Sequence, residues 1–192
     1  MLWTAHGFSP TRIVGLTSYT VSFLVCTVRW LKGSRIKGAK KPRGRSFAWL
    51  ALVQALLLGD IYFEWRWSLH DIFVRTAVAH GVYGERRGPQ VWALAALLIT
   101  LLCCTVPVLY QFGRRRGFAL ALAGTLLSLG LWCAETVSYH FTDQILFYKL
   151  GDVMLVGVLW AITAVITCAG AWIDGWASKP RARAVARRGA SA

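Results

Sequence analysis

Charged residues are scarce in this chain of 192 residues, and acidic residues are the scarcest of them. Only 16% of the residues are charged, and eight Asp and Glu stand against 22 Lys and Arg. A soluble domain carries about 25% charged residues, so the composition disfavours a water-soluble fold. The segments 91–112 and 153–173 contain no charged residue at all. Because about 17–25 apolar residues cross the hydrocarbon core of a bilayer, these two segments indicate transmembrane helices.

The chain also lacks paired cysteines. Its five cysteines form no Cys-x-x-Cys pair and all lie in apolar segments, at Cys26, Cys103, Cys104, Cys133 and Cys168. This placement is typical of small buried apolar side chains and disfavours a disulfide framework, a zinc site or thiol–disulfide redox chemistry. The first residues contain neither a basic segment nor a small-residue cleavage site, so we expect the first apolar segment to be retained as a transmembrane span.

The surplus of basic residues gives a formal net charge of +14 at pH 7. Such a surplus can indicate nucleic-acid binding. Here, however, the basic residues lie almost entirely in the loops that flank the apolar segments. That position is typical of topology determinants and of contacts with lipid head groups. We therefore expect the lipid bilayer, and not nucleic acid, to be the main partner.

Five apolar segments are long enough to span, and together they predict an all-α integral membrane bundle. The predicted spans are 13–31, 47–65, 91–112, 118–139 and 145–173, within one bundle domain of residues 1–176. Residues 66–90 carry too many charges to cross, and their periodicity favours a short interfacial helix on the outer side. Residues 177–192 form a basic cytoplasmic tail whose composition predicts disorder.

The distribution of Lys and Arg between the predicted loops indicates the orientation. Sixteen of these residues fall on the side that contains the C-terminus, and six fall on the other side. Basic loops remain in the cytoplasm, so we expect a plasma (inner) membrane protein with its N-terminus outside and its C-terminus inside. Tryptophans fall near both predicted membrane boundaries, as interfacial indole rings do.

Acidic residues and histidines gather toward the predicted outer face. Seven of the eight acidic residues and all four histidines fall on that side. With a helical rise of about 1.5 Å per residue, Asp60, Glu135 and Asp152 are expected at one depth, roughly 7–8 Å inside the bilayer. Carboxylates this close together repel, so they need a proton, a metal ion or a basic side chain. Arg66 and Lys149 are the nearest basic side chains.

Carboxylates and imidazoles together favour a cation site, and a transition-metal ion with a redox role is one form of it. The predicted ligands are Asp60, Glu64, His70, Glu135, His140 and Asp152. The Glu-x-x-His pairs of di-iron carboxylate bundles do not occur. No motif identifies a cofactor, a substrate or a reaction, so the sequence leaves open whether the protein is an enzyme.

Two other functions and one structural explanation fit the same residues. The chain can be a non-catalytic subunit or assembly factor of a larger complex, with a membrane-protein partner or a second copy of itself. It can also be a proton-coupled or ion-coupled transport element, although few polar residues line the inner halves of its spans. In the structural explanation, the carboxylates pair with Arg66 or Lys149, or cap neighbouring helices.

Overall fold

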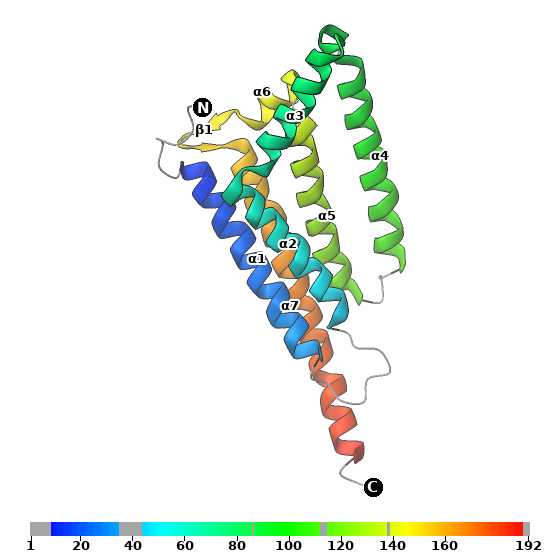
Figure 1. Ribbon diagram of the computed structural model, residues 1–192. Coiled ribbons are helices and arrows are strands. Elements are labelled where there is room, and N and C mark those ends of the chain that lie inside the picture. The colour runs from blue at the N-terminus through cyan, green and yellow to red at the C-terminus, as the bar shows by residue number, and fades with distance from the viewer. Residues whose placement is uncertain (1–8, 35–43, 86, 112–114, 138, 190–192) are drawn as a thin grey trace.

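A computed structural model describes residues 9–34, 44–85, 87–111, 115–137 and 139–189, which form helices and one short hairpin (Figure 1). Among them, five helices are long and apolar enough to cross a membrane. These helices are α1 (Pro10–Ser34), α2 (Arg45–Phe63), α4 (Arg87–Gln111), α5 (Arg116–Val137) and α7 (Leu155–Gly189). The predicted all-α membrane bundle is confirmed.

The core of the bundle is formed by α1, α2, α5 and α7, whereas α4 stands at one side and packs mainly against α5 (Figure 1). Three segments join these helices at one end of the molecule. They are α3 (Trp65–Ala79) followed by the 3₁₀ helix η1 (Tyr83–Glu85), the short helix α6 (His140–Leu146), and a hairpin of β1 (Lys149–Leu150) and β2 (Val153–Met154).

The structure differs from the prediction at both ends of the last span. Residues 145–154 belong to the end of α6 and to the hairpin, so the membrane-spanning part of α7 begins at Leu155. Gly151 makes the hairpin turn with a φ of +67°, a conformation that favours glycine. At the other end α7 continues to Gly189, where the composition predicts a disordered tail.

Small residues let the backbones of α5 and α7 approach each other closely. A methyl group added at Gly170 would collide with the backbone of Ala121, and one added at Gly124 would collide with Thr167. Close approach of this kind lets helices associate in lipid by van der Waals packing. Lipid tails are as apolar as the side chains, so burying apolar side chains between helices supplies no hydrophobic driving force there.

Replacing Gly170 with Ala should therefore separate α5 from α7. We expect a loss of about 1–3 kcal/mol in the free energy of unfolding, because the added methyl group meets backbone atoms that cannot rotate away. The midpoint of thermal denaturation of the detergent-purified protein measures this loss. Gly88→Ala is the matched control, since nothing lies within 4 Å of a methyl group there. Equal midpoints for the two variants would contradict the close contact of α5 with α7 at Gly170.

Candidate functional site

A sharp corner between α2 and α3 organises the end of the bundle that carries α3, α6 and the hairpin. Glu64 lies between the two helices in the left-handed region, with φ 59° and ψ 36°, and its backbone N–H donates to the carbonyl of Asp60 at 2.6 Å. A non-glycine residue in this region is uncommon and costs about 1–3 kcal/mol. The corner turns α3 away from the α2 axis (Figure 1).

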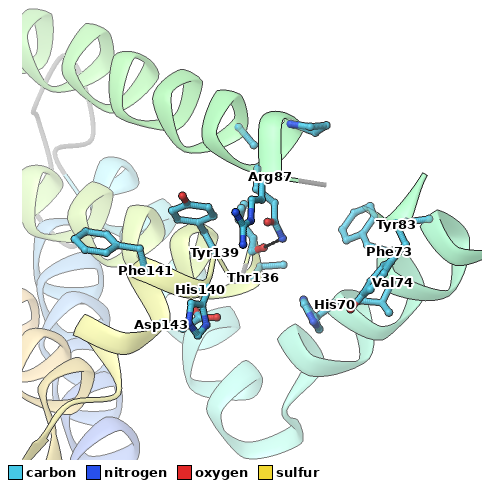
Figure 2. A pocket seen from close by; sticks show the side chains of 15 residues that line it. His70, Phe73, Val74, Tyr83, Arg87, Thr136, Tyr139, His140, Phe141 and Asp143 are labelled. Atoms are coloured by element: carbon cyan, nitrogen blue, oxygen red, sulfur yellow. Dashed lines mark hydrogen bonds between the residues drawn. The ribbon is translucent and has the colours of Figure 1, made fainter. Parts of the chain in front are cut away.

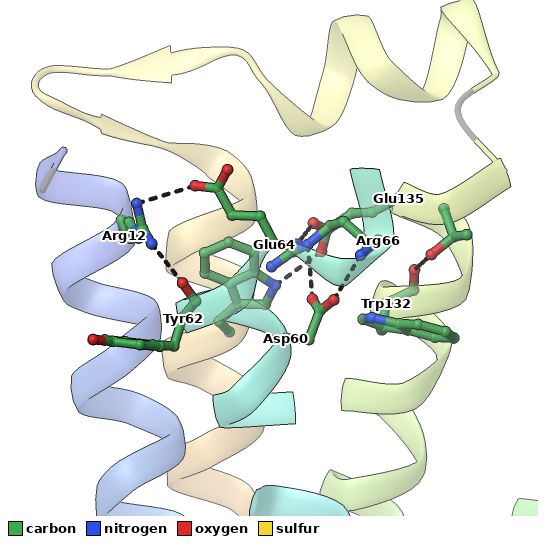
Figure 3. A network of polar contacts seen from close by, with 9 residues as sticks. Arg12, Asp60, Tyr62, Glu64, Arg66, Trp132 and Glu135 are labelled. Atoms are coloured by element: carbon green, nitrogen blue, oxygen red, sulfur yellow. Dashed lines mark hydrogen bonds and ion pairs between the residues drawn. The ribbon is translucent and has the colours of Figure 1, made fainter. Parts of the chain in front are cut away.

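The Arg66 side chain lies between two buried carboxylates (Figure 3). Its Nε is 2.8 Å from Asp60 Oδ2, and its Nη1 donates to Glu135 Oε2. The Arg66 backbone N–H also donates to Asp60 Oδ1 at 2.8 Å, so Asp60 accepts a bond from the first turn of α3. Arg66 is 6% exposed, while Asp60 and Glu135 are each 2% exposed. Here α2, α3 and α5 are held together by charge.

Trp160 on α7 completes this arrangement. Its Nε1 donates to Glu135 Oε1 at 2.9 Å, and the Arg66 Cζ lies 5.1 Å from the centroid of its ring. Burial lowers the pKa of the Arg66 guanidinium, and the charge of Asp60 opposes that shift. Buried charges are tolerated only when they are paired and hydrogen-bonded. Three of the four oxygens of Asp60 and Glu135 accept a hydrogen bond, and the fourth, Asp60 Oδ2, is paired by charge with the Arg66 Nε.

A second ion pair lies nearer the surface of the same corner. Arg12 Nη1 is 3.0 Å from Glu64 Oε1, and Arg12 Nη2 donates to the Tyr62 carbonyl at 2.7 Å. Their side chains are 28% and 35% exposed. We call Arg12, Asp60, Glu64, Arg66 and Glu135 the ionic network. Its formal charges are three negative and two positive, so one negative charge is in excess.

A cavity of about 290 Å³, the ionic chamber, adjoins this network. Its lining residues come from α1, the α2–α3 corner, α5, the hairpin and α7, and they are Ser9, Thr11, Arg12, Ile61, Glu64, Arg66, Trp67, Glu135, Phe147, Met154, Val156 and Trp160. Aromatic rings form much of its wall. Trp67 and Phe147 are stacked with their centroids 6.2 Å apart.

A larger cavity, the outer pocket, lies between α3 and the start of α4 and has a volume of about 780 Å³ (Figure 2). One wall is formed by α3 and η1 with His70, Phe73, Val74, Ala77 and Tyr83. The other wall is formed by the start of α4, with Arg87, Pro89, Gln90 and Ala93. The end of α5 and the start of α6 complete it with Thr136, Val137, Tyr139, His140, Phe141 and Asp143. None of these residues also lines the ionic chamber.

The structure divides the six predicted ligands among the ionic network, the outer pocket and the hairpin. Three of them belong to the ionic network, where Asp60 and Glu135 meet at Arg66 and Glu64 pairs with Arg12. His70 and His140 line opposite sides of the outer pocket. Asp152 lies in the exposed hairpin turn. The expectation that Asp152 shares the depth of Asp60 and Glu135 is therefore wrong, because the last span begins after it.

Within the described part of the chain, no group of three or more His, Cys, Asp or Glu side chains is placed to hold a metal ion. Metal binding thus stays a prediction. The structure adds two residues to the candidate site, Arg66 and Trp160. The sequence offers a weak signal for both, since Arg66 is the nearest basic residue and Trp160 falls inside a span, away from the interfacial level that tryptophan prefers.

Comparison with known protein families, curated proteins and solved structures finds no match to this chain.

Replacing Arg66 with Met should destabilise the protein strongly. Removing one partner of a buried ion pair leaves uncompensated charge and costs about 3–5 kcal/mol. Adding Asp60→Asn and Glu135→Gln to the variant should recover much of the loss, because the remaining groups are then uncharged. Thermal denaturation in detergent measures both effects, and Arg75→Met, at an exposed position of α3, serves as control. If the triple variant is no more stable than Arg66→Met, charge pairing is not what holds the corner.

Proposed function

We propose that this chain is a plasma-membrane protein with its N-terminus outside, and that its ionic chamber binds a small organic cation at the outer face. The observation that carries the proposal is the uncompensated negative charge of the ionic network beside a cavity with aromatic walls. A cation of the ammonium type is the ligand whose charge and shape suit both features.

The charge argument rests on burial. Asp60 and Glu135 are almost fully enclosed, and the single guanidinium of Arg66 compensates only one of them. An excess charge in a medium of low polarity is costly, and a bound cation would offset that cost. Glu64 is the carboxylate best placed to meet the cation, because it lines the chamber and is the most exposed of the three acids. Its Oε1 already pairs with Arg12, so a bound cation would share this carboxylate with the guanidinium.

The walls favour an organic cation over a bare metal ion. Trp67, Phe147 and Trp160 offer ring faces, which attract ammonium and guanidinium groups by about 0.5–2 kcal/mol. Trp160 already accepts the guanidinium of Arg66 in this way. The volume of about 290 Å³ falls at the lower limit of ligand cavities, which run from about 300 to 1,000 Å³. A compact ligand such as choline fits that limit better than a long-chain amphiphile.

Binding of choline to the detergent-purified protein, followed by isothermal titration calorimetry, tests this proposal. We expect Glu64→Gln to weaken choline binding by about tenfold or more, because a charge-assisted contact contributes about 1.5–3 kcal/mol. Asp71→Asn removes the same charge from an exposed position of α3 and should leave binding unchanged. Zinc and manganese salts are titrated in parallel. Binding of a metal without binding of choline would overturn the organic-cation proposal in favour of a metal site.

The proposed orientation is tested with alkaline phosphatase, which is active only where its disulfides form, outside the cytoplasm. We expect an active enzyme when it is inserted at Gly84 and an inactive one when it is fused to the C-terminus. Green fluorescent protein at the C-terminus, which fluoresces in the cytoplasm, provides the complementary signal. The reverse pattern would place the ionic chamber on the cytoplasmic side.

A further inference from the structure

We infer that the outer pocket binds a neutral amphiphile whose flat ring carries hydrogen-bond acceptors on opposite edges, the chemistry of a quinone. The inference is independent of the proposed cation site, because none of the described residues lines both cavities.

The first argument is the placement of the two imidazoles. His70 projects from α3 and His140 from the start of α6, on opposite sides of the pocket (Figure 2). The Gln144 amide nitrogen lies 3.1 Å from His140 Nε2. When Nε2 accepts from that amide, the neutral ring carries its proton on Nδ1. In this tautomer His140 retains an N–H donor, and donors on two facing walls suit a ring with an acceptor at each edge.

The second argument is charge. The formally charged residues that line the outer pocket are Arg87 and Asp143, and their charges cancel when histidines are counted as neutral. A ligand with a net charge would find no surplus of opposite charge to compensate its desolvation. A neutral head group with polar atoms meets no such penalty.

The third argument is the apolar part of the pocket. Phe73 and Phe141 are 60% and 63% exposed, and aromatic faces of this kind stack on a flat ring. Val74, Ala77 and Ala93 continue the apolar surface between α3 and α4. A volume of about 780 Å³ exceeds what one ring fills and leaves room for the first part of an alkyl chain. The remainder of that chain would leave between two helices, toward lipid.

The test is native mass spectrometry of the full chain in detergent, titrated with decylubiquinone. We expect one bound quinone per chain. The double variant His70→Leu/His140→Leu should weaken binding by about tenfold or more through the loss of two hydrogen bonds. The variant His70→Gln/His140→Gln keeps side-chain donors and should bind within a few-fold of the original protein. Circular dichroism and gel filtration confirm that each variant is folded.

Three further measurements make the inference falsifiable. Decylbenzene has the same chain and ring size but no carbonyl groups. Equal affinity for decylbenzene would show that the pocket binds apolar molecules without hydrogen bonds to a ring, which would overturn the inference. Displacement of the quinone by dioctanoyl phosphatidylglycerol at equal concentration would instead assign the pocket to an anionic lipid. Unchanged quinone affinity in the His→Leu double variant would also overturn the inference. Glu64→Gln should not alter quinone binding, which separates this site from the ionic chamber.

Discussion

The contact of the Arg66 guanidinium with Asp60 and Glu135 is the constraint on which the α3 end of the bundle depends. Without the guanidinium, α2 and α5 would present two buried carboxylates to each other at a level where water cannot separate them. With it, the same charges fix the start of α3 over the bundle, and the Trp160 N–H binds α7 into the arrangement. The left-handed conformation of Glu64 is the backbone strain that this pairing sustains.

The spanning helices could be predicted because their signal is local: a long apolar segment must cross or be buried wherever the rest of the chain lies. The start of the last span could not be placed in the same way. Ile145, Leu146 and Phe147 are as apolar as the residues of a span, yet they lie at the end of the short helix α6, at the same end of the bundle as α3. The turn that follows is made by Gly151, which has a positive φ. In the sequence this residue is a single glycine, and a glycine alone does not distinguish a hairpin turn from a close contact between helices.

The candidate site was predictable in composition but not in geometry. The gathering of acids at one end, and the need of Asp60 and Glu135 for a partner, follow from sequence and from the cost of charge in lipid. The division of the predicted ligands follows from the corner at Glu64, which carries His70 away from Asp60. A left-handed glutamate has no sequence signal of its own, since most such positions are glycine or asparagine. If α2 and α3 were one continuous helix, Asp60, Glu64 and His70 would all lie along the same helix axis.

The helix α3 is a wall that the two cavities share. Trp67 faces the ionic chamber and His70 faces the outer pocket, and their rings meet edge to face with centroids 6.3 Å apart. The two residues are less than one turn apart, so the Arg66 contacts with Asp60 and Glu135, which hold the start of α3, also set the position of the outer-pocket wall. The two spaces nevertheless differ in what they accept. The ionic chamber is small and lies against a network that has one negative charge in excess when Asp60 is counted, whereas the outer pocket is larger and has ample apolar surface. A compact cation and a flat ring with an alkyl chain therefore suit different spaces.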